Sequence, residues 1–68
     1  MEFKEKAKVQ IEHWISHSRH HEEDYDAFAK ELTAEGYIES AEAITNMMNF
    51  EHKSAECLEK ALIGLKDK

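Results

Sequence analysis

Four of the five histidines of this chain lie within nine residues, at His13, His17, His20 and His21. An α-helix advances by about 100° per residue, so His13, His17 and His21 would form a ladder along one edge, with His20 and Asp24 beside it. Two imidazoles at positions i and i+4 can chelate one metal ion, and a nearby carboxylate would complete a mixed nitrogen and oxygen ligand set. The cluster therefore predicts a transition-metal site, and this donor set suits Zn, Ni, Co, Cu or Fe equally.

Glu51 is the second polar anomaly, because it interrupts an otherwise apolar heptad series. An isolated ionised carboxylate there would cost several kcal/mol, so it needs a partner. In an antiparallel helix pair with a short turn near residue 36, residues whose numbers sum to about 70 to 72 lie at the same height. Glu51 is then level with Ser18 and His21. The predicted metal ligands are His17, His21 and Glu51, with His13, His20 and Asp24 as secondary candidates.

Each of these residues also has a structural interpretation. Histidines and glutamates commonly cover solvated helix faces, which would account for His13, His17 and His20. His21 and Glu51 could form a buried hydrogen-bonded pair that sets register and oligomeric state without any metal. The residue types alone leave both interpretations open.

The composition indicates the elements that must position these side chains. The 68 residues include no proline and two glycines, and helix-forming residues dominate, which predicts an all-α protein. Gly36 is the one strong interruption, so we expect a single helical-hairpin domain over residues 1–68, with helices at about 3–35 and 38–66 and a turn at 36–37. The core seam of the first helix is predicted as Ala7, Ile11, Trp14, Ser18, His21, Tyr25, Phe28 and Leu32. That of the second is Ala41, Ile44, Met48, Glu51, Ala55, Leu58, Leu62 and Leu65.

A three-helix bundle is the alternative fold. It would break the first helix at Ser16–Ser18, with Ser18 as the N-cap and Glu22 and Glu23 in the first turn. The heptad seam passes through this stretch in phase, and a serine inside a helix costs only a few tenths of a kcal/mol. We therefore favour one continuous helix.

A two-helix hairpin cannot cover both of its helices, so we expect it to associate. The second helix carries an adjacent apolar stripe, termed here the second seam: Ala43, Met47, Phe50, Ser54, Cys57, Ala61 and Gly64. Two such stripes predict a homodimeric four-helix bundle with the second helices at the new interface. Trp14, Phe28, Met47, Met48 and Phe50 are then expected in the core, Cys57 as a small buried filler, and His52 exposed on the flank opposite the histidine ladder.

Charge and hydropathy exclude several function classes. Fifteen acidic against nine basic residues give a formal net charge of −6, the wrong sign for nucleic acid or an anionic membrane surface. The mean hydropathy of −0.75 and the lack of an 18-residue apolar run argue against a spanning helix. The single cysteine and the polar first ten residues indicate a reduced, cytoplasmic protein.

The residues His13, Trp14, His17 and His21 form an H-W-x-x-H-x-x-x-H pattern. The chain in this respect resembles a group of short prokaryotic helical-hairpin domains, largely uncharacterised. The resemblance implies that the three histidines act together, without supplying an activity. The spacings His17-x-x-x-His21 and His52-x-x-x-Glu56 also distantly resemble hemerythrin-like metal bundles.

We therefore expect a small metal-binding protein for storage, delivery or sensing, with its site inside a dimeric bundle. The alternative is a metal-free dimerisation or adaptor module whose polar layer only sets the pairing. A di-iron redox or oxygen-handling enzyme is a third hypothesis, but the seams hold too few carboxylates and no recognisable acid, base or nucleophile set. An enzymatic role is not expected.

Overall fold

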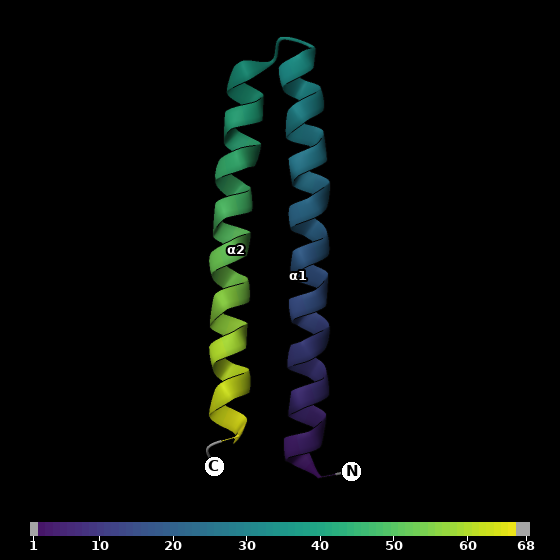
Figure 1. Cartoon of the computed structure of the whole chain (residues 1–68), viewed down its shortest axis with the longest axis vertical. Coiled ribbons are helices and arrows are strands. Elements are labelled where there is room, and N and C mark those ends of the chain that lie inside the picture. The colour runs from purple at the N-terminus through teal and green to yellow at the C-terminus, as the bar shows by residue number, and fades with distance from the viewer. Residues whose placement is uncertain (1, 67–68) are drawn as a thin grey trace.

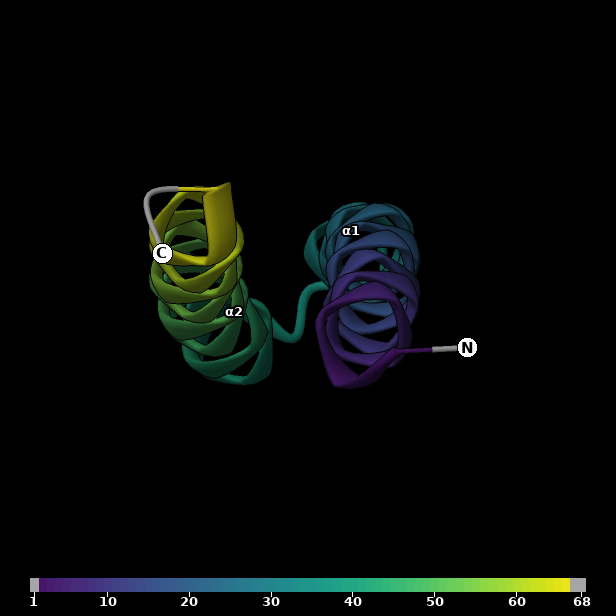
Figure 2. The same cartoon turned by 90° about the horizontal axis from the view of Figure 1, so that it is seen from below.

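Two long antiparallel helices lie side by side in a single layer (Figures 1 and 2). The structure is a computed structural model that describes residues 2–66; residues 1, 67 and 68 of the predicted domain lie outside the described residues. Helix α1 spans Phe3–Ala34 and helix α2 spans Ile38–Lys66. The Cα atoms extend over 51 × 17 × 10 Å, as expected for a helix of 32 residues that rises about 1.5 Å per residue. The predicted all-α helical hairpin is confirmed.

The turn is built around Gly36, which has a φ of 90°. The amide of Gly36 donates to the carbonyl of Thr33 at 3.1 Å, and the amide of Tyr37 donates to the carbonyl of Leu32 at 2.9 Å. These two bonds form a Schellman motif, which satisfies the last carbonyls of α1 and needs a left-handed residue at the glycine position. Helix α2 begins directly afterwards, where the amide of Ala41 donates to the carbonyl of Tyr37.

Helix α1 is continuous through Ser16–Ser18, so the three-helix alternative is wrong. Ser18 does not cap a helix; its hydroxyl reaches across to α2 and donates to Glu51. A serine whose hydroxyl has a partner outside its own helix no longer competes for the local backbone groups, so the helix passes through it.

The residues buried between the two helices are mostly small. Among the described residues the buried ones are Ile15, Ser18, Ala29, Ala41 and Ala55, and none of the side chains in this part of the chain is less than 2% exposed. Each helix therefore buries only one narrow stripe. Two helices side by side form one layer, so the described residues have no enclosed core.

The predicted seam of α2 is confirmed, since all eight of its members are buried or half-buried. In α1 the prediction is wrong at two positions: Trp14 is 50% and Phe28 is 51% exposed, and the adjacent Ile15 and Ala29 are buried instead. Ile11, Ser18 and Tyr25 form one heptad line of the contact. Either the stripe of Trp14 and Phe28 or the stripe of Ile15 and Ala29 can lie beside this line and complete the contact. The smaller Ile15 and Ala29 let the helix axes approach more closely than two aromatic rings would allow.

The second seam of α2 lies outside the contact between the helices. In the single hairpin, Met47 is 39% and Phe50 is 70% exposed. Cys57 is also exposed. The core positions expected for these residues belong to the predicted dimer interface and stay a prediction. These residues lie about 100 to 150° around α2 from the line of Ala55, so α1 cannot reach them. In the described part of the chain, neither helix combines the length and hydropathy that a membrane crossing requires.

Candidate metal site

A polar layer crosses the hairpin at mid-height, where Ser18 of α1 meets Glu51 of α2. The Ser18 hydroxyl lies 2.7 Å from Oε1 of Glu51 and 3.2 Å from its main-chain carbonyl oxygen. Ser18 is only 4% exposed, and the Glu51 side chain is 26% exposed. The predicted convergence of the two polar interruptions at one height is therefore present, and the carboxylate has a hydroxyl donor on its inner side.

His21 approaches the same carboxylate from the side of the hairpin. Its Nδ1 atom lies 3.8 Å from Oε1 of Glu51, and the imidazole is 38% exposed. In a tetrahedral site with metal–ligand distances near 2.0 Å, two donor atoms are about 3.3 Å apart. A shift of about half an ångström would thus bring the two atoms to a ligand separation. The side of the hairpin that carries them is called the histidine flank below.

The histidine ladder continues along the edge of α1. The ring centroids of His17 and His21 are 4.3 Å apart in an edge-on arrangement, those of His13 and His17 are 6.2 Å apart, and the Tyr25 ring follows His21 at 5.7 Å. Spacing of four residues places each ring over the turn before it. His17 and His21 are therefore close enough to share one ion, while His13 only stacks on His17.

The six predicted ligands fall into two groups. His17, His21 and Glu51 lie together at the polar layer. His20 and Asp24 are exposed on α1, and His13 is one turn further from Glu51. Among residues 2–66, no group of three His, Cys, Asp or Glu side chains is already arranged to hold an ion. A single hairpin thus presents a partial ligand set.

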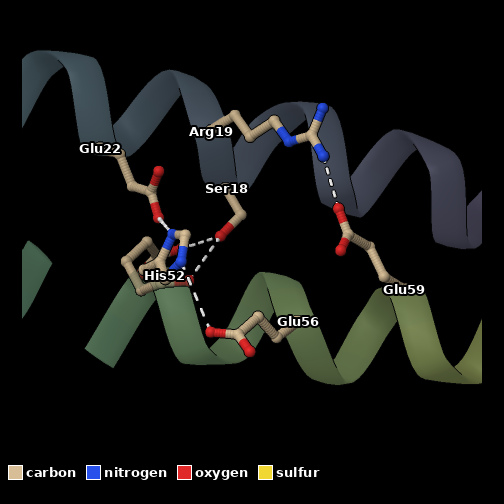
Figure 3. Close-up of polar contacts among 7 residues, drawn as sticks. Ser18, Arg19, Glu22, His52, Glu56 and Glu59 are labelled. Carbon is tan, nitrogen blue, oxygen red and sulfur yellow. Dashed lines mark hydrogen bonds and ion pairs between the residues drawn. The ribbon is translucent and has the colours of Figure 1, made fainter. Parts of the chain in front are cut away.

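A second polar cluster, on the opposite flank, was not predicted as a unit. His52 places Nδ1 3.3 Å from Oε1 of Glu22 and Nε2 3.4 Å from Oε1 of Glu56, so its ring lies between the two carboxylates (Figure 3). His52 is 67% exposed, as expected, but Oε1 of Glu22 is inaccessible and lacks a hydrogen bond of good geometry. The sequence did indicate that Glu22 faces α2, because Glu22 lies midway in a heptad series with Ile15 and Ala29.

This cluster, called the ion-pair flank below, differs chemically from the histidine flank. The two carboxylates approach different nitrogens of one ring, so they do not converge on a common point where an ion would bind. Arg19 and Glu59 add a further cross-helix ion pair there, with side chains 62% and 45% exposed (Figure 3). Exposed pairs of this kind contribute little to stability, about 0.2 to 1 kcal/mol. The ion-pair flank therefore fits a solvated surface.

The fold and the polar layer define a small helical-hairpin protein in which Ser18 and His21 of α1 approach Glu51 of α2. Residues 7–65 match the sequence profile of a family described as "Domain of unknown function (DUF8180)", and the chain belongs to this family. The match covers most of both helices and includes every candidate ligand. Neither the curated proteins nor the solved structures contain a significant match to the chain.

Proposed function

We propose that this protein binds a transition-metal ion through His17, His21 and Glu51, for storage, delivery or sensing. The single observation that carries the proposal is the 3.8 Å separation between Nδ1 of His21 and Oε1 of Glu51, beside the ring of His17. Two imidazoles and one carboxylate supply the borderline donors that Zn, Ni, Co, Cu and Fe accept. The partial exposure of His21 and Glu51 leaves an entry path for the ion.

The surroundings of Glu51 support this role. The Ser18 hydroxyl donates to the carboxylate from the buried side and fixes its orientation, as outer-sphere partners do at metal sites. A carboxylate in the seam costs stability unless it is paired, so its presence requires a compensating partner. A bound cation is such a partner, and it would stabilise the folded chain by linkage.

The test is a metal titration of the untagged protein, followed by elemental mass spectrometry. We expect His17→Ala, His21→Ala and Glu51→Gln each to lower the affinity for Zn²⁺ or Co²⁺ at least tenfold. His52→Ala is the matched control, because it removes an imidazole at nearly the same height on the ion-pair flank, and it should bind as the wild type does. Unchanged metal content in all three site variants would overturn the proposal.

A second candidate is a metal-free dimerisation or adaptor module. The observation that favours it is the 2.7 Å contact from the Ser18 hydroxyl, which already gives Glu51 a hydrogen bond without an ion. In that case the polar layer sets register and pairing only. A melting temperature that is the same with and without chelator would favour the adaptor role over the metal site.

A further inference from the structure

The two flanks of the hairpin differ sharply in charge. The predicted seam and the second seam of α2 together hold fifteen positions, and Glu51 is the only charged residue among them. In a chain that is 35% charged, roughly five would be expected at random. The cross-helix ion pairs among the described residues, apart from His21–Glu51, lie on the ion-pair flank. The α2 side of the histidine flank thus lacks the charges that keep a helix face in water, while on α1 Asp24 lies beside the histidine ladder.

Large apolar side chains are exposed on the histidine flank. Trp14 and Phe28 lie one heptad before and one heptad after His21, so all three occupy one line along α1, and both rings are half exposed. On α2, Met47 and Phe50 of the second seam are exposed beside Glu51. A shallow, mostly apolar hollow extends the patch toward the start of α1, and it is lined by Phe3, Lys6, Ala7, Gln10, Ile11 and Trp14. Contiguous apolar patches of this kind mark interaction sites.

The patch is self-complementary about the polar layer. A two-fold axis perpendicular to the helices at His21 would place Trp14 of one copy at the height of Phe28 of the other, because each lies seven residues from His21. The same axis passes α2 near Phe50, since residue numbers at one height sum to about 70 in this antiparallel pair. It then sets Met47 against the small Ser54 and Ala43 against Cys57. Phe50 lies near the axis and therefore near Phe50 of the other copy, and the small residues on either side of it let the two helices approach.

We propose that the occupant of the histidine flank is a second copy of this chain, related by that two-fold axis, so that two hairpins form a four-helix bundle. The α2 helices pack on each other through their uncharged second seams, and Trp14 packs on Phe28 across the α1 helices. A broad face of 51 × 17 Å has a footprint close to the roughly 800 Å² that each partner contributes to a standard interface. The second copy also supplies the missing layer over Trp14, Phe28 and Phe50.

The dimer would complete the ligand set, and this part of the inference rests on the proposed function. The axis brings the His21 and Glu51 side chains of both copies to one layer. It also sets Asp24 of one copy at the height of His17 of the other, because these residues are nearly equidistant from His21. A single hairpin offers three ligands at most, whereas the symmetric layer offers enough donors for a closed coordination sphere.

The first test measures mass by light scattering in chelator, so it does not depend on any metal. The wild type should be a dimer of twice 7.9 kDa at micromolar concentration. Phe28→Glu should be a monomer, because it places a carboxylate against Trp14 of the other copy. Val9→Glu is the control: Val9 is 56% exposed on the same helix but lies about 140° around it from Trp14, so this variant should stay dimeric. A wild-type mass of 7.9 kDa would overturn the dimer, and equal masses for the two variants would overturn the proposed interface.

A cross-linking test addresses the orientation of the copies. Ala43→Cys adds a thiol that the proposed axis sets opposite Cys57 of the other copy, and 14 residues along one helix separate the pair within a chain. Mild oxidation should therefore give a covalent dimer at least tenfold faster than for Thr45→Cys, the control at a similar height about 160° around α2 from Ala43. Equal rates for the two variants would overturn this arrangement.

A Zn²⁺ titration distinguishes the proposed metal site from the proposed dimer. Phe28→Glu keeps His17, His21 and Glu51 but should lose at least tenfold in Zn²⁺ affinity if the second copy contributes ligands. A monomeric wild type that binds Zn²⁺ through these residues would overturn the dimer and leave the metal site standing. A dimeric wild type without Zn²⁺ affinity would leave the association standing and overturn both the metal site and its completion by a second copy.

Discussion

The replacement Glu51→Leu should stabilise the protein in the presence of chelator. The Glu51 side chain is about three quarters covered, since it is 26% exposed. Fully burying a leucine contributes about 1.5 to 3 kcal/mol, so this position should gain about 1 to 2 kcal/mol. The charged hydrogen bond from Ser18 is lost, but the Ser18 hydroxyl keeps an acceptor in the main-chain carbonyl at 3.2 Å. The lost hydrogen bond to the carboxylate is offset because folding no longer has to bury a charged group in the seam.

We therefore expect the free energy of unfolding to rise by about 1 kcal/mol, which corresponds to a melting temperature about 4 to 8 °C higher for a chain of this size. The assay is thermal and urea unfolding followed by circular dichroism, at one fixed protein concentration because association shifts apparent stability. Glu42→Leu, at an exposed position of α2, is the control and should change stability by less than about 0.5 kcal/mol. Destabilisation by Glu51→Leu in chelator would refute the reasoning, because the carboxylate would then contribute to folding without an ion.

Further substitutions test the other parts of the fold. Ser18→Ala should lower the free energy of unfolding by about 1 kcal/mol in chelator, because Glu51 loses its nearest donor; unchanged urea unfolding would contradict the 2.7 Å contact. Gly36→Ala should cost about 1 kcal/mol in thermal unfolding, because its φ of 90° is unfavourable for a residue with a Cβ. Gly64→Ala, in a helix with nothing within 4 Å of the new methyl group, should instead be neutral or gain about 0.5 kcal/mol, and equal signs for the two glycines would refute the assigned turn. Arg19→Ala should change stability by less than about 0.5 kcal/mol even at low salt, since its ion pair with Glu59 is exposed.

The polar layer shows how far sequence reasoning reaches in a hairpin. Gly36 marked the turn and the heptad spacing gave the register of the two helices. From these the sequence predicted that Ser18, His21 and Glu51 share one height, and the structure places them in contact. The cluster of Glu22, His52 and Glu56 was missed because two adjacent heptad stripes competed for the same contact in α1. Periodicity alone does not say which stripe turns inward when both are partly apolar.

Trp14 and Phe28 show the same ambiguity between two neighbouring stripes, here for apolar residues. Their hydrophobicity predicted burial, but in the hairpin they are half exposed, and Ile15 and Ala29 occupy the contact. The helices approach through small residues, so the large rings are displaced to the edge of the interface. Helix α2 does not cover these two large apolar side chains, which is the reason to expect a second copy of the chain.

The amino-acid sequence by itself determined the two helices, the turn at Gly36 and the height at which the polar residues meet, because helix propensity, glycine at positive φ and heptad spacing are local properties of the chain. Only the tertiary structure decided the rotation of α1 about its axis. That rotation buries Ile15 and Ala29, exposes Trp14 and Phe28, and assigns His21 and Glu22 to opposite flanks. It depends on how closely two helix surfaces pack, which is a property of the pair and not of either segment.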